Sequence, residues 1–269
     1  MIYCNCIENY CNCIENYRQR DLLPSFFKIN TEERSGIMEF IPTECLEKLG
    51  NEDILTLAWN CTPNKVQSIL LLHLSGRDYI LLDLVNPQLD TFGAFEREIQ
   101  TLDEIRDFLE YLLKSHEANL EFLGSFRNRE TLIRLLPVVK KQIPQVNDLS
   151  SLESYLLGLR ERVLAYYRIY RQVQVLPFKT GDIIITLSPD RQPINREKLI
   201  QHERGYMLLP TEWESVAIDD ELMSKEVLCE YLFALLVEEH CILIFSHSTE
   251  NGTTEETVLE CGSFLKSAV

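Results

Sequence analysis

The longest periodic run of apolar residues in this chain lies between residues 149 and 173 and alternates steps of three and four. Its members are Leu149, Leu152, Leu156, Leu159, Val163, Tyr166, Tyr170 and Val173. This spacing places all of them in one stripe of an α-helix. Asp148 stands directly before the run, where an N-cap carboxylate accepts hydrogen bonds from first-turn amides. The run predicts a long helix that forms a coiled-coil seam or lies along a hydrophobic core.

The part of the chain before this helix is predicted to be rich in strands and then in helices. Runs of apolar residues at 54–60, 66–74 and 79–85 are separated by turn-forming residues, which is typical of an antiparallel β-meander. Thr101 and Glu104 have the spacing of a capping box at a helix start. A second helix is predicted over 120–143, with a break or kink at Pro137 and an end at Pro144.

The part after the long helix returns to mixed structure. Strands are predicted at 183–187, 205–209, 241–245 and 257–261, the last after an Asn251-Gly252 hairpin. A helix capped by Asp219 or Asp220 is predicted to run to about residue 239. The predicted fold class is α+β: an antiparallel meander with packed helices, a long central heptad-patterned helix and a smaller C-terminal mixed α/β part. We expect a lobe over 22–146 and a second over 147–269.

Residues 3–17 contain two identical copies of CNCIENY, and residues 1–21 are expected to be a flexible Cys-rich repeat segment. Its four thiols, Cys4, Cys6, Cys11 and Cys13, are candidate zinc or Cu(I) ligands. A CxC pair in a helix, however, points its two sulfurs about 200° apart. A structural explanation is favoured over metal binding, and no cofactor is predicted.

The charge balance limits the partners that this chain can have. Its formal net charge is −16, which repels phosphate backbones and anionic lipids unless basic residues are segregated. Residues 127–171 carry nine basic and four acidic residues, whereas residues 212–260 carry one basic and thirteen acidic. No apolar run is long enough for a membrane span, and the start of the chain lacks the pattern of a signal peptide. We therefore expect a cytoplasmic protein with reduced thiols and no membrane association.

Motifs of the common enzyme classes are missing from the sequence. It contains no GxGxxG, GxxxxGK[ST], HExxH, GxSxG or CxxC pattern, and only 10 glycines. Weak catalytic candidates are His73, Asp83, His202 and His247. A two-residue turn at Gly76-Arg77 would place His73 and Asp83 on opposite faces of the sheet, and one residue of register shift would reverse this. A histidine in an apolar strand such as His73 is more often a structural residue, and the basic residues around His202 equally suggest an exposed, salt-linked turn.

Arginines and tyrosines are interleaved along the predicted long helix. The candidate binding residues are Arg160, Arg162, Tyr167, Arg168 and Arg171, since arginine binds phosphate and tyrosine stacks on bases. The net charge opposes nucleic-acid binding by residues 155–171, and the apolar stripe commits Tyr166 and Tyr170 to packing. A solvated, structural helix face is the favoured explanation of this pattern.

Three functions stay open at this point. The favoured one is a non-catalytic interaction, regulatory or assembly protein that binds a protein partner or self-associates. The second is a hydrolase or nuclease with an unrecognised His/Asp site. The sequence leaves open whether the chain is an enzyme and favours a protein that is not. The third is a nucleic-acid binder that uses the Arg/Tyr helix.

Overall fold

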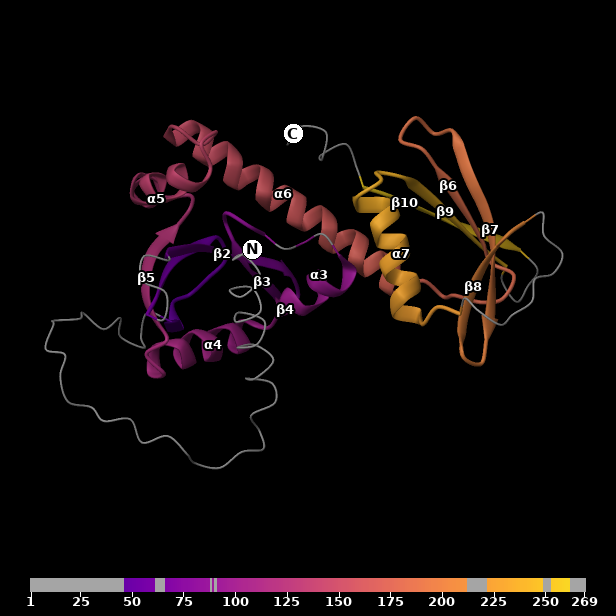
Figure 1. Cartoon of the computed structure of the whole chain (residues 1–269), viewed down its shortest axis with the longest axis horizontal. Coiled ribbons are helices and arrows are strands. Elements are labelled where there is room, and N and C mark those ends of the chain that lie inside the picture. The colour runs from indigo at the N-terminus through magenta and orange to yellow at the C-terminus, as the bar shows by residue number, and fades with distance from the viewer. Residues whose placement is uncertain are drawn as a thin grey trace, which may run out of the picture.

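The fold is that of a computed structural model, which describes residues 46–60, 66–87, 89, 91–211, 222–248 and 253–261 (Figure 1). The predicted Cys-rich repeat, with all four candidate metal ligands, lies outside the described residues. Two antiparallel five-stranded sheets and five helices, one of them long, make up the described fold, which confirms the α+β class.

The first sheet contains the predicted meander. Its strand order is β4-β3-β2-β1-β5, and every pairing is antiparallel. The strands are β1 (Asp53–Trp59), β2 (Val66–Ser75), β3 (Asp78–Asp83), β4 (Ile99–Gln100) and β5 (Ala118–Ser125). The first three match the three predicted runs.

Helices cover both faces of the first sheet. Its strands carry apolar side chains on both faces, and both faces must therefore be shielded from water. On one face, Leu55, Leu57, Ile69 and Leu71 pack with α4 (Leu102–Lys114). The capping box of Thr101 and Glu104 is present at the start of α4, as predicted. On the other face, strand residues such as Leu70 pack with α5 (Arg129–Gln142) and α6 (Leu149–Gln174).

The helix predicted over 120–143 is wrong in its first part, because residues 118–125 form β5. Buried and exposed side chains alternate from Ala118 to Glu121, which fits a strand that completes the open edge of β1. The helix begins at Arg129 after the N-cap Asn128 and continues through Pro137 to Gln142. The proline therefore does not end the helix, although it removes one backbone hydrogen bond from it.

The long helix is α6, and it begins after the predicted N-cap Asp148. Of its stripe, Leu152, Leu156, Leu159 and Val163 are buried in the core, and α6 runs from the first sheet to the second (Figure 1). Of the two predicted alternatives, a coiled-coil seam and a helix along a hydrophobic core, the structure therefore shows the second. The predicted lobe boundary at 146/147 falls in the loop before α6 and stays a prediction.

The second sheet has the order β10-β9-β6-β7-β8. Its strands are β6 (Ile183–Leu187), β7 (Pro193–His202), β8 (Gly205–Pro210), β9 (Ile242–Ser248) and β10 (Thr254–Glu260). Strand β7 was not predicted, because its polar residues lack an apolar pattern. Helix α7 (Lys225–Val237) is capped by Ser224 and not by the predicted Asp219 or Asp220. The predicted hairpin at Asn251-Gly252 lies outside the described residues.

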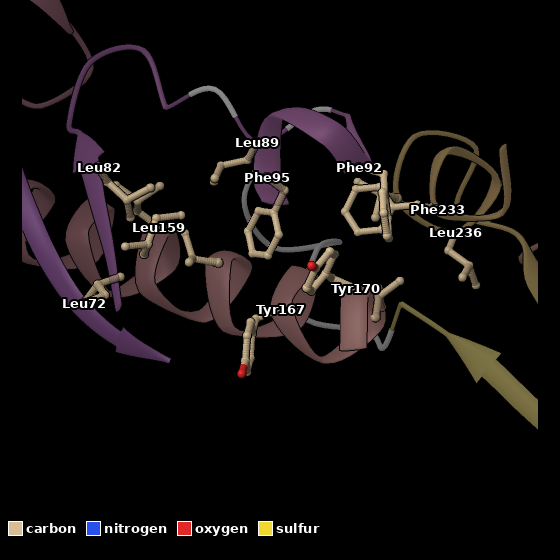
Figure 2. Packing of buried hydrophobic residues seen from close by; sticks show 14 of the residues in the cluster. Leu72, Leu82, Leu89, Phe92, Phe95, Leu159, Tyr167, Tyr170, Phe233 and Leu236 are labelled. Carbon is tan, nitrogen blue, oxygen red and sulfur yellow. The ribbon is translucent and has the colours of Figure 1, made fainter. Parts of the chain in front are cut away.

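An aromatic cluster joins the short helix α3 (Phe92–Glu98) to α6 and α7 (Figure 2). The ring centroid of Phe233 on α7 lies 5.8 Å from Phe92, 6.2 Å from Phe95 and 6.1 Å from Tyr166. One continuous cluster of buried side chains includes strand residues of both sheets. The two sheets therefore share a core.

Candidate functional site

The second sheet has an inner and an outer face, and its strand register assigns each residue to one of them. On the inner face, Ile184, Leu199 and Phe245 pack into the shared core together with residues of α6 and α7. Side chains of directly paired residues project from the same face. The neighbours of Ile184 in its own strand, Ile183 and Ile185, therefore project from the outer face.

Six aliphatic side chains from four strands meet on the outer face. None of them belongs to either of the two core clusters that the described residues form. Five are half-buried and Val258 is 55% exposed. We call this set the outer-face patch: Ile183, Ile185, Leu187, Ile200, Ile244 and Val258. Met207, Leu209 and Ile242 lie on the same face but are buried.

Charged side chains of opposite sign flank the outer-face patch. Arg196 and Lys198 project from β7 on one side of the central strand β6, and both are exposed. Glu256 and Glu260 project from β10 on the other side, and both are exposed. The face thus has a basic side, an apolar centre and an acidic side.

The structure does not bring the predicted pair His73 and Asp83 into contact. Ile69 pairs with Asp83 and His73 with Tyr79, one residue away from the predicted register. The two side chains therefore share a face, but four positions along β2 separate them by about 13 Å. The Asp83 carboxylate accepts hydrogen bonds from Gln67 at 2.7 Å and from the amide of Val85 at 2.8 Å. These contacts hold the end of β3 in place, and neither of them involves a histidine.

The other two candidate histidines lie on the second sheet. His202 is exposed at the β7–β8 turn. His247 Nδ1 lies 2.7 Å from Oδ1 of Asp182, whose side chain is 2% exposed. The second carboxylate oxygen of Asp182 accepts the amide of Lys179 at 2.8 Å. Sequence reasoning missed this pair, because Asp182 and His247 come together only through the β6–β9 register.

The arginines of the predicted binding helix differ in how far their charge is compensated. Arg160 donates to Glu52 at 2.9 Å and also pairs with Glu161. Hydrogen bonds from Arg127 and the charge of Arg160 hold the pKa of the Glu52 carboxyl below its usual value. Arg171 donates to Gln174 at 3.1 Å, whereas Arg168 is exposed and Arg162 is half-buried.

The tyrosines of α6 are turned toward the protein. Tyr167 is 7% exposed and Tyr170 is 4% exposed. Their hydroxyls donate to Asp78 at 2.6 Å and to Glu96 at 2.9 Å. Burial, together with the bond to Asp78, raises the pKa of Tyr167 to about 12. Neither ring is accessible for stacking on a nucleic-acid base.

The thiols that the structure describes are Cys229, Cys241 and Cys261. Burial raises the pKa of each, to about 11 for Cys229 and Cys261, so these thiols stay protonated near neutral pH. Within the described ranges, no group of three or more His, Cys, Asp or Glu side chains could hold a metal ion. No helix in the same ranges is long and apolar enough to cross a membrane.

Comparison of the chain with protein-family models, with curated proteins and with solved structures finds no match in any of the three. Any function must therefore be argued from the described surfaces.

A signal for the outer-face patch is present in the sequence. Ile183, Ile184 and Ile185 are consecutive, and in a strand such a run is apolar on both faces. Strands of this kind normally have both faces covered. The charged flanks could not be found in this way, because their positions depend on the pairing of four strands.

Proposed function

We propose that this chain is a non-catalytic interaction or assembly protein that binds a protein partner through the outer face of its second sheet. The observation that carries the proposal is the outer-face patch, whose aliphatic side chains lie outside both core clusters. A contiguous apolar surface with a polar rim is the usual composition of a protein-binding site.

Two features of the described residues favour this proposal over a hydrolase or nuclease. Contacts with Gln67 and Val85 occupy the Asp83 carboxylate, and His73 Nε2 lies 3.2 Å from the carbonyl of Gly76. The Asp182–His247 pair resembles a base and its orienting carboxylate, but a hydrolytic site also requires a nucleophile within reach of the histidine. The contacts described for His247 are to Asp182 and to the Phe245 ring, neither of which is a nucleophile.

The third function, nucleic-acid binding by α6, has less support. Base stacking would require the buried rings of Tyr167 and Tyr170 to leave the core. Arg160 is already paired with carboxylates. The remaining exposed charge on this helix is better explained as a solvated face.

A pair of substitutions in the centre of the patch tests the proposal. Ile185→Thr/Ile244→Thr keeps β-branched side chains in the two central strands but removes apolar contact area. We expect this variant to lose association with any partner, while its circular dichroism spectrum stays unchanged. The measurement is quantitative affinity capture with the full chain, in which the same bound protein is followed for each variant.

The matched control is Ile133→Thr, since Ile133 is 52% exposed on α5 and lies away from the second sheet. It should bind as the unchanged chain does. Equal binding by all three proteins, or no association of the unchanged chain with itself or another protein, would contradict the proposal.

A further inference from the structure

We infer that the partner of the outer face is a second copy of this chain, packed face to face about a twofold axis that runs along β6. The inference rests on the proposed function, since it names the partner for the same surface. It follows from the order of residues across the second sheet, from their charges and from the size of the patch.

The register places charges of opposite sign in one row across the sheet. Ile183 on β6 pairs with Lys198 on β7 and, on its other side, with Ser246 on β9, which pairs with Glu256 on β10. Lys198 in turn pairs with Leu209 on β8, so the row reads Leu209, Lys198, Ile183, Ser246, Glu256. The next row contains Arg196, Ile185, Ile244 and Val258 in the same order. Positive charge lies on one side of β6 and negative charge on the other.

Strand β6 is the central strand of the five. A twofold axis along it places β7 of one copy over β9 of the other, and β8 over β10. Residues of one row then face the same row of the second copy in reverse order. Leu209 then lies over Glu256 of the second copy and Lys198 over Ser246, so that Lys198 and Glu256 are offset by one strand spacing of about 4.8 Å. Symmetry makes this pair twice, and the patch residues of the two copies meet between them.

The separation between two packed sheets can be bridged by the side chains of Lys198 and Glu256. Packed sheets lie about 10 Å apart. A lysine and a glutamate that extend toward each other from facing sheets can span that separation. The face is therefore self-complementary in charge as well as in its apolar centre, which is the requirement for an isologous interface.

Pairing of two copies edge to edge through β10 is one alternative to packing face to face. That strand has no further neighbour among the described strands. It carries Glu255, Glu256 and Glu260, so that two β10 strands side by side would bring carboxylates together. Charge therefore favours the face over the edge.

The size of the face predicts a weak dimer. Five strands about 4.8 Å apart and about six residues long at about 3.3 Å each give a face of roughly 500 Å² per copy. The total of about 1,000 Å² lies at the lower end for specific interfaces, so we expect a dissociation constant in the micromolar range. Since the net charge of −16 repels copies at low salt, association is best measured at about 0.15 M salt.

A charge exchange within the row tests the inference by sedimentation equilibrium of the full chain. The mass of the unchanged chain should rise with concentration from 31.4 kDa toward twice that value. Lys198→Glu and Glu256→Lys should each weaken the dimer about tenfold, because each change makes two like-charge pairs. The double variant Lys198→Glu/Glu256→Lys should recover to within about threefold of the unchanged chain, since it restores both pairs.

The control is Lys141→Glu, which alters the net charge as Lys198→Glu does but at an exposed position on α5. It should dimerise as the unchanged chain does. A chain that stays monomeric at all concentrations, or a double variant no better than the single ones, would overturn the inference. The proposed function would still hold if Ile185→Thr/Ile244→Thr abolished binding of a different protein, so the two failures are distinguishable.

Discussion

Phe233→Ala should lower the free energy of unfolding by about 3–5 kcal/mol, the usual cost of truncating a fully buried phenylalanine. Phe233 is 0% exposed and its ring contacts rings of α3 and α6. Since these helices connect the two sheets, we expect both sheets to lose stability in one transition. Denaturant unfolding followed by far-UV circular dichroism measures the loss.

Val227→Ala is the matched control for Phe233→Ala, because Val227 lies on the same helix but is 46% exposed. It should cost less than about 1 kcal/mol. If Phe233→Ala cost no more than this control, or if the two sheets unfolded in separate transitions, the shared core would be contradicted.

Gly205→Ala is expected to cost at least about 2 kcal/mol, since it combines backbone strain with a steric clash. Gly205 has a φ of +156°, and a Cβ at this position would lie 2.5 Å from the carbonyl oxygen of Met223. That carbonyl accepts the amide of Tyr206 at 2.7 Å. The clash would therefore separate β8 from the segment that leads into α7. The same unfolding measurement reports it.

A second glycine with positive φ distinguishes the clash from the strain. Gly76 has a φ of +58°, and a Cβ there would meet nothing within 4 Å. Gly76→Ala should therefore cost only about 1–2 kcal/mol, the price of the left-handed conformation. If Gly205→Ala lowered the free energy of unfolding no more than Gly76→Ala does, the predicted clash with Met223 would be contradicted.

The elements that could be predicted from the sequence are those with a regular spacing of apolar residues and with capping or turn residues at their ends. Helix α6 follows from its apolar spacing and its N-cap Asp148, and the meander follows from three apolar runs with turn residues between them. Residues 120–125 are predicted as part of a helix over 120–143, because their apolar residues also fit a helical stripe. Pairing with β1 decides in favour of a strand, and that pairing is not a local property.

The candidate site depends on register even more than the fold does. Lys198 and Glu256 are far apart in the sequence and share a row only because four strands pair in the observed order. The Asp182–His247 contact arises in the same way across 65 residues. A one-residue slip would move either set to the other face. The sequence therefore indicates an apolar strand at 183–187, but not what lies beside it.

The most direct test of the outer face as the interaction surface is an isoleucine-methyl NMR titration of the full chain. As its concentration is raised, or as a captured partner is added, the methyl signals of Ile183, Ile185 and Ile244 should shift. The signal of Ile133, exposed on α5, should stay in place. Shifts confined to Ile133 and other methyl groups away from the second sheet would contradict the account.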